Sequence, residues 1–189
     1  MATASRKTVK APSDSVARNA PARPPAPQEA TELLRADHKR VSALFEQYEK
    51  TRSNARKKAL VAEICMELSI HAQVEEEIFY PAVKAALKDK ELVPEATVEH
   101  ATLKELIAQV EGMEPDGEMF DARIKVLSEY VKHHVKEEQT EMFPKSRKTR
   151  LDMHELGAQI ASRKVELKAS WQGAAEKPGL RPRLAEAVA

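Results

Sequence analysis

The chain has few of the residues that would tie it to a membrane, to a disulfide framework or to a polyanion. Aromatic residues make up 4% of its 189 residues, and no apolar run approaches the roughly 18 residues of a transmembrane helix. The single cysteine, Cys65, excludes an intrachain disulfide and favours a reducing compartment, so we expect a cytoplasmic protein. A formal net charge of +1 argues against a nucleic-acid or membrane partner.

The N-terminal region also lacks apolar runs. It is rich in alanine, proline and arginine and can bury too little apolar surface to offset the entropy of ordering, so we expect a disordered arm over residues 1–28. The lack of an apolar stretch argues against a secretory signal, while arginine, serine and alanine are also abundant in organellar transit peptides. The arm has no interleaved aromatic residues and little charge, so nucleic-acid binding is not expected there.

What the chain has in abundance is charge of both signs and helical periodicity. Charged residues form 32% of it, which suits helices with solvated faces. Apolar residues such as Leu34, Val41 and Phe45 recur at spacings of three and four, and no segment alternates like a strand. Prolines 81 and 144 are expected to kink or end helices. We therefore predict an all-α protein whose main body, residues 29–147, is a bundle of helices at 31–48, 54–80, 94–112 and 118–143.

A further helix is expected beyond the bundle. Asp152 is followed three residues later by Glu155, and this spacing is typical of a capping box at a helix N-terminus. The pattern predicts an additional C-terminal helix over residues 148–172, after the basic segment KSRKTR. Residues 173–189 are expected to form a flexible tail.

The second half of the bundle nearly repeats the first. HAQVEEEIFYP begins at His71, and HVKEEQTEMFP begins at His134. When the two stretches are aligned on their prolines, His71 matches His134 and Glu75 matches Glu138. Each pair is a His-x-x-x-Glu motif, and residues four apart lie on the same face of a helix. The repeat therefore predicts two equivalent helices that each present one histidine and one carboxylate.

The helices that precede these motifs match as well. His38 lies 71 − 38 = 33 residues before His71, and His100 lies 134 − 100 = 34 residues before His134. The chain is thus two copies of one helical hairpin. All of these histidines fall on apolar stripes, so four imidazoles and two carboxylates are expected to point into one core.

Six polar groups in one core need something that pairs them, because an unpaired buried charge costs several kcal/mol. Imidazole and carboxylate ligands suit iron, zinc, copper or manganese better than magnesium or calcium. Two bridging carboxylates would let each of two ions take two histidines, with oxo or hydroxo groups derived from water completing the charge balance. We therefore predict a metal centre whose ligands are His38, His71, Glu75, His100, His134 and Glu138.

The combination of His38, HAQVE, Glu99-His100 and HVKEE followed by MFP resembles the hemerythrin-like family, also called the HHE cation-binding domain. The resemblance covers residues 31–144. It implies an up-and-down four-helix bundle over residues 29–147 that holds two non-haem iron ions, with dioxygen, peroxide or nitric oxide as the small-molecule ligand. Members of the family also sense iron or redox state through an attached protein partner, which is the alternative function.

The sequence departs from the oxygen-carrying members in two places. Lys104 stands where carriers have a second histidine on the third helix. Carriers also use a His-x-x-x-x-acid spacing on the fourth helix, which His133 would satisfy, whereas the internal repeat favours His134. Five residues on a straight helix turn by about 140°, so His134 is the preferred ligand. The missing histidine argues against reversible oxygen carriage.

The acids that flank these ligands are expected to have other roles. Asp37 and Glu99, which directly precede ligands, are expected to support them from outside rather than to bind metal. The run that continues through Glu76 and Glu77 is expected to be a solvated face. A metal-free helical scaffold is the competing hypothesis for the whole set, since duplication of an inert hairpin also produces a repeat.

Overall fold

The computed structural model describes residues 28–88 and 90–175. Almost all of the predicted arm over residues 1–28, and most of the predicted tail over 173–189, lie outside the described residues. Within the described ranges every regular element is helical, so the prediction of an all-α protein is confirmed. None of the described helices is both long enough and apolar enough to cross a bilayer.

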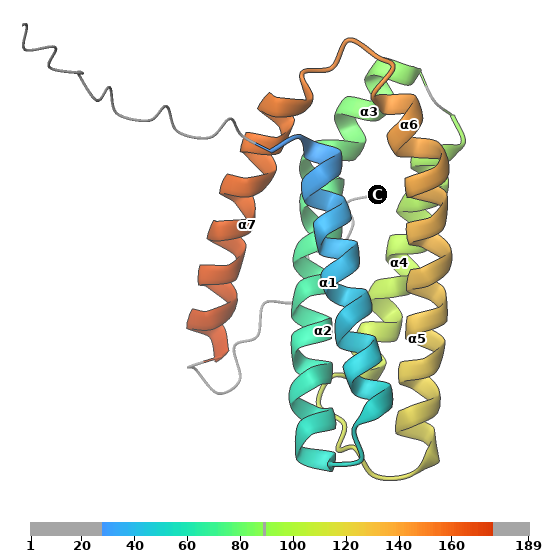
Figure 1. Cartoon of the computed structure of the whole chain (residues 1–189), viewed down its shortest axis with the longest axis vertical. Helices are drawn as coiled ribbons and strands as arrows, with labels where there is room; N and C mark the ends of the chain where they lie inside the picture. Colours follow the sequence, from blue (N-terminus) through green and yellow to red (C-terminus); the bar gives the residue numbers. More distant parts are fainter. Residues whose placement is uncertain (1–27, 89, 176–189) are drawn as a thin grey trace, which may run out of the picture.

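Four long helices form the body of the molecule: α1 (Ala30–Lys50), α2 (Asn54–Val74), α4 (Leu92–Val110) and α5 (Glu118–Glu137). They run alternately up and down, and each hairpin packs as a pair, α1 with α2 and α4 with α5 (Figure 1). A further helix, α7 (Met153–Ala175), lies outside this body against α1 and α2. It extends three residues beyond the expected end at residue 172.

The helix ends follow local capping chemistry. The Ser53 side chain accepts a hydrogen bond from the backbone N–H of Arg56 at 3.4 Å, which satisfies one free donor at the start of α2. The Asp152 carboxylate accepts bonds from the backbone N–H groups of His154 and Glu155 at 3.1 and 3.0 Å and caps α7. Gly112 follows α4 at φ 77°, a left-handed conformation that favours glycine after a helix.

The second helix of each hairpin contains a wider turn that the sequence did not predict. The α2 helix passes into a π-helix, η1 (Glu75–Phe79), and then into α3 (Tyr80–Leu87); α5 passes into η2 (Glu138–Met142) and then into α6 (Phe143–Ser146). The backbone N–H of Tyr80 reaches the carbonyl of Glu75, five residues back, and Phe143 does the same to Glu138. Each π-turn comes just before a proline, which cannot donate the regular α-helical bond. The helices predicted to end at residues 80 and 143 therefore continue past Pro81 and Pro144, into α3 and α6.

Two apolar clusters fill the interior, one on each side of the histidine level. The first contains Leu44, Ile64 and Leu127 among others, and the second contains Phe79 and Phe143 among others; these five side chains are each at most 1% exposed. On α1, for example, Leu34 belongs to the second cluster and Val41 to the first, so His38 lies between them. The same alternation holds on α2 and α4. On α5, Val131 before His134 belongs to the first cluster, and the second cluster begins beyond this helix, at Met142 of η2. Polar side chains at the level of the histidines are therefore covered by apolar side chains on both sides along the bundle.

The packing of α7 depends on one close backbone approach. A Cβ atom added at Gly157 would lie 2.0 Å from the carbonyl oxygen of Gln28 and 3.0 Å from the nitrogen of Ala30. Ile160, one turn along, is fully buried in the second apolar cluster. Charged side chains of α7 add ion pairs, with Arg163 to Glu77 and with lysines 164 and 168 to residues of α1 and α2.

We expect Gly157→Ala to destabilise the protein, although alanine is ordinarily favoured over glycine inside a helix by about 1 kcal/mol. The added methyl group meets backbone rather than a flexible side chain, so α7 must shift, at a cost of about 1–3 kcal/mol. Urea unfolding followed by circular dichroism measures the change. The exposed α7 substitution Ser162→Ala is the control and should leave the unfolding midpoint nearly unchanged; equal midpoints for both variants would contradict the close approach.

Candidate metal centre

The structure brings the six predicted ligand residues together at the middle of the bundle, each less than 7% exposed. The histidines form two pairs. The Nε2 atoms of His38 and His71 lie 2.9 Å apart, and those of His100 and His134 lie 3.1 Å apart. Two nitrogens at right angles on one ion, each bound at about 2.1 Å, would lie about 3.0 Å apart. Each pair therefore has the spacing of two neighbouring ligands on one metal ion.

The two carboxylates connect the pairs. Glu75 Oε2 lies 3.1 Å from His71 Nε2 and 3.5 Å from His100 Nε2. Glu138 Oε2 lies 3.3 Å from His38 Nε2 and 3.6 Å from His134 Nε2. Each carboxylate thus contacts one histidine from each pair. The two carboxylates therefore link the two histidine pairs into one buried cluster.

The residues fit a bound cation on the evidence of their own unsatisfied atoms. Glu75 Oε1 is buried without a hydrogen-bond partner. Glu138 Oε2 is also buried without a hydrogen bond, although the imidazole nitrogens of His38 and His134 lie 3.3 and 3.6 Å away. Buried carboxylate oxygens are almost always paired, because leaving one unpaired costs free energy. Donor atoms of His38, His71, Glu75 and Glu138 all lie within 4.8 Å of one another, as do those of a second group formed by Glu75, His100 and His134. Nitrogen and carboxylate donors of this kind suit a transition metal.

The outer nitrogens of two histidines face acids of their own hairpins. His71 Nδ1 lies 3.3 Å from Asp37 Oδ2, and His134 Nδ1 lies 2.6 Å from Glu99 Oε2. A carboxylate at this position holds the proton on Nδ1 and leaves the Nε2 lone pair directed into the centre. In both hairpins the supporting acid directly precedes the histidine of the first helix.

The other two histidines are supported from the opposite hairpin. His100 Nδ1 lies 3.1 Å from Glu76 Oε1, and His38 Nδ1 lies 2.9 Å from the side-chain amide of Gln139. Glu76 also accepts a bond from Lys104 at 2.6 Å. The expectation that Glu76 belongs to a solvated face is therefore wrong, because the π-turn rotates it toward α4. Glu76 and Gln139 each follow a carboxylate ligand, so they occupy equivalent places in the repeat.

Tyr80 is a centre residue that sequence reasoning missed. Its hydroxyl lies 2.9 Å from Glu138 Oε1, 3.1 Å from His100 Nε2 and 3.4 Å from Glu75 Oε2. On a straight α-helix, a residue five positions after Glu75 would point elsewhere; the π-turn brings it back over the ligand. The repeat signals the position, since Tyr80 aligns with Phe143, but the phenyl ring of Phe143 instead stacks on His38 with centroids 5.8 Å apart.

Of the two adjacent histidines on α5, His134 faces the centre. The side chain of His133 is 61% exposed and lies on the surface, with its Nε2 3.6 Å from Glu99 and 3.4 Å from Glu137. The internal repeat and the geometry therefore both favour His134 over His133 as the candidate ligand.

Burial and charge act in opposite directions on the histidines. Burial lowers the pKa of His71, but Glu75 and Asp37 outweigh it and raise the pKa to about 10. Burial likewise opposes protonation of His134, yet Glu138 and Glu99 raise its pKa above the ordinary value. Burial lowers the pKa of His38 below its ordinary value despite the contact with Glu138. The metal-free centre thus carries protons near neutral pH that a bound cation would displace.

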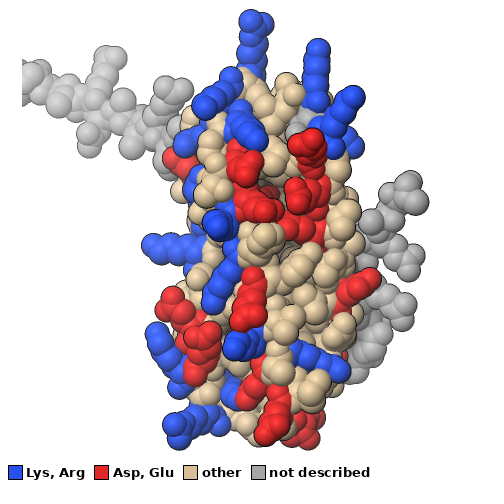
Figure 2. All heavy atoms as spheres, turned by 90° about the vertical axis from the view of Figure 1, so that its right-hand side faces the viewer, with Lys and Arg blue, Asp and Glu red and all other residues tan. Residues whose placement is uncertain are grey.

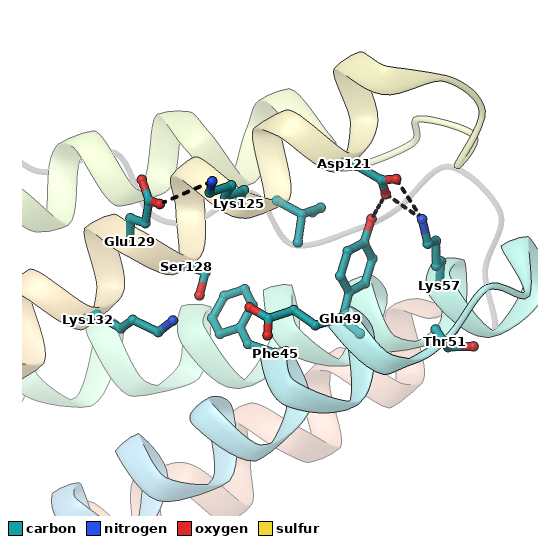
Figure 3. A pocket seen from close by; sticks show the side chains of 11 residues that line it. Phe45, Glu49, Thr51, Lys57, Asp121, Lys125, Ser128, Glu129 and Lys132 are labelled. Atoms are coloured by element: carbon teal, nitrogen blue, oxygen red, sulfur yellow. Dashed lines mark hydrogen bonds and ion pairs between the residues drawn. The ribbon is translucent and has the colours of Figure 1, made fainter.

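A groove between α1 and α5 adjoins the centre. It has a volume of about 290 Å³, and its lining includes Phe45, Val131 and Val135 together with His38 of the centre. His38, Val131 and Val135 also border a small internal space against His71 and His134. A larger cavity of about 490 Å³ lies farther along the same two helices, where Lys57 holds the Asp121 carboxylate at 2.6 and 2.7 Å (Figure 3).

Comparison with known proteins agrees with this geometry. The family model described as "Hemerythrin HHE cation binding domain" matches residues 29–146. The chain belongs to this family. Its fold is similar to the crystal structure of a hemerythrin HHE cation binding domain-containing protein from Mycobacterium kansasii, at a TM-score of 0.69 and 24% identity, covering 80% of this chain and 94% of that one.

A curated relative is similar over a shorter part of its own length. The chain is 27% identical over 112 residues to a protein named DNA nickase from Nostoc sp. (strain PCC 7120). The match covers 59% of this chain but only 32% of the relative, so the chain spans about a third of that protein.

The raised pKa of His71 predicts how the metal-free protein responds to pH. A group whose folded pKa of about 10 exceeds its unfolded value near 6.5 stabilises the fold fully below pH 6.5, and this stabilisation is lost as pH rises toward 10. We expect the free energy of unfolding in the presence of chelator to fall between pH 7 and 9.5, by up to about 1.4 kcal/mol per pH unit. Urea unfolding at several pH values measures it. The variant His71→Asn should lose much of this slope, and an unchanged slope would contradict the assignment.

Proposed function

We propose that the six buried residues hold two iron ions and that the protein reacts with a small oxidant, namely dioxygen, peroxide or nitric oxide. The observation that carries this proposal is the arrangement of two imidazole pairs joined by two carboxylates, each with a buried oxygen that makes no hydrogen bond. Membership of a cation-binding family supports a metal at this place. Iron comes from the family resemblance, since the same donors also suit zinc or manganese.

The chain's own residues prepare the centre for such a reaction. Bound iron would supply the electrons for reduction of the oxidant. His38 and His71 would hold one ion, and His100 and His134 the other. The Tyr80 hydroxyl, 2.9 Å from Glu138, carries a proton at the edge of the centre, and burial together with Glu138 and Glu75 keeps its pKa above the ordinary value. The apolar residues above and below exclude bulk water.

Oxidant chemistry suits this chain better than reversible oxygen carriage. The position that carries an additional histidine in oxygen carriers is Lys104, whose ammonium group is held by Glu76 at 2.6 Å. Glu76 in turn contacts the outer nitrogen of His100. Lys104 therefore supports a ligand from outside instead of binding metal. DNA nicking is not part of the proposal, because the match to the relative of that name covers 32% of its length.

The proposal predicts about two iron ions per chain after expression with added iron in air, with near-ultraviolet and visible absorption of a ferric centre. The double variant His71→Ala/Glu138→Ala removes one histidine and one carboxylate and should lose both the bound iron and the absorption. Metal analysis and absorption spectra measure the two quantities.

A matched control is His154→Ala/Glu141→Gln, which removes one histidine and one carboxylate from exposed positions. The control should bind iron like the wild type. Two equivalents of zinc or manganese in place of iron would retain the metal centre and reject the redox function. Equal iron content in the wild type and the buried-site variant would reject the centre itself.

A specific contact supports a sensing function as a second candidate. Lys164 of α7 pairs with Asp37, and the other oxygen of Asp37 lies 3.3 Å from His71 Nδ1. A chain of polar contacts therefore runs from a ligand of the centre to the outer helix. Metal occupancy would then strengthen the docking of α7, because binding to the folded state alone stabilises that state.

For this sensing function, we expect hydrogen exchange in residues 153–172 to slow by about tenfold or more when the metal-free protein is loaded with iron. The variant Lys164→Gln should reduce that difference, because the contact with Asp37 is lost. Lys168→Gln, which breaks an ion pair between the same helix and Glu67, is the control. Identical exchange in α7 with and without metal would remove the structural basis for signalling through this helix.

A further inference from the structure

A second cluster of metal-ligating side chains lies on the surface beside the buried centre. Glu99 of α4 and His133 and Glu137 of α5 each offer a donor atom, and these atoms all lie within 4.8 Å of one another. His133 Nε2 is 3.6 Å from Glu99 Oε1 and 3.4 Å from Glu137 Oε1. His133 and Glu137 are four residues apart on one helix, so they share a face and can bind the same ion.

The cluster is open to solvent on one side and joined to the centre on the other. The side chains of His133 and Glu137 are 61% and 37% exposed, whereas that of Glu99 is 11% exposed. Glu99 Oε1 faces the surface cluster, while Glu99 Oε2 lies 2.6 Å from Nδ1 of His134. A single carboxylate therefore belongs both to the surface cluster and to the support of a buried ligand.

The surface around the cluster carries both signs of charge. Figure 2 shows acidic and basic side chains interspersed over the face formed by α4 and α5, with several acidic side chains close together in its upper half. Carboxylates gathered at one place raise the local concentration of divalent ions. The six ligands of the buried centre are themselves less than 7% exposed, so an ion that reaches them must exchange its water for protein ligands on the way in.

We propose that Glu99, His133 and Glu137 form a surface divalent-cation site that captures metal ions and supplies them to the buried centre. The inference rests on the proposed function of that centre as a metal site. In this proposal the ion moves from the surface site to the buried centre past Glu99. Of the three residues, Glu99 alone also contacts a ligand of the buried centre, His134. A histidine and two carboxylates bind a first-row transition metal more weakly than the full buried ligand set, as a supplying site requires.

The test uses the full-length, metal-free protein and Co²⁺ as the probe. Cobalt uptake is followed by its visible absorption, and the number of ions bound is measured by equilibrium dialysis. The variant His133→Ala/Glu137→Gln should fill the buried centre about tenfold more slowly than the wild type but reach the same two tightly bound ions. The weaker third ion of the wild type should be absent. Glu129→Gln, which removes one exposed carboxylate from the same helix, is the control.

Uptake in the double variant as fast as in the wild type, with the third ion retained, would overturn the inference. Equal slowing in Glu129→Gln would also overturn it, since the effect would then come from surface charge in general. One weak ion per chain that the double variant loses, with no buried ions in the wild type, would support the surface site and reject the proposed function of the centre. The surface cation site and the proposed function of the buried centre are therefore tested separately.

Discussion

Charge that is buried must be paired, and the rest of this structure depends on how that requirement is met. Glu75 and Glu138 are 0% and 2% exposed, in a core where an unpaired carboxylate costs several kcal/mol. Imidazoles from all four long helices, together with a bound cation, can satisfy both carboxylates. Each helix must therefore deliver its polar residue at the same level, and the apolar clusters above and below keep that level free of competing water.

Much of this arrangement could be predicted from the sequence because it is set by local periodicity. The spacing of four between His71 and Glu75, and its repeat at His134 and Glu138, is enough to place these side chains on one face of a helix. Tyr80 and Glu76 could not be assigned in the same way. Their directions depend on a π-turn, and the contacts of that turn with α4 and α5 are tertiary and leave no periodic signal.

The two halves of the centre are related by repeat but differ chemically. Tyr80 reaches the centre in one hairpin, whereas the equivalent Phe143 packs flat on His38 in the other. Glu76 supports His100 with a negative charge, whereas the equivalent Gln139 supports His38 with a neutral amide. The His100 and His134 side therefore has the more anionic and more hydrogen-bonded surroundings. Duplication explains the common framework, and substitution at equivalent positions has made its two sides distinct.

Each π-turn holds one residue more than an α-helical turn and lies between two α-helical parts of the same helix. Residues before the turn set the direction of the histidine and carboxylate, while residues after it set the direction of Tyr80 or Phe143. Loss of one residue within η1 would place Tyr80 four positions after Glu75, and an α-helical turn would then keep both side chains on one face. The π-turn therefore holds one additional residue, which carries Glu76 toward α4, without turning the downstream helix away from the centre.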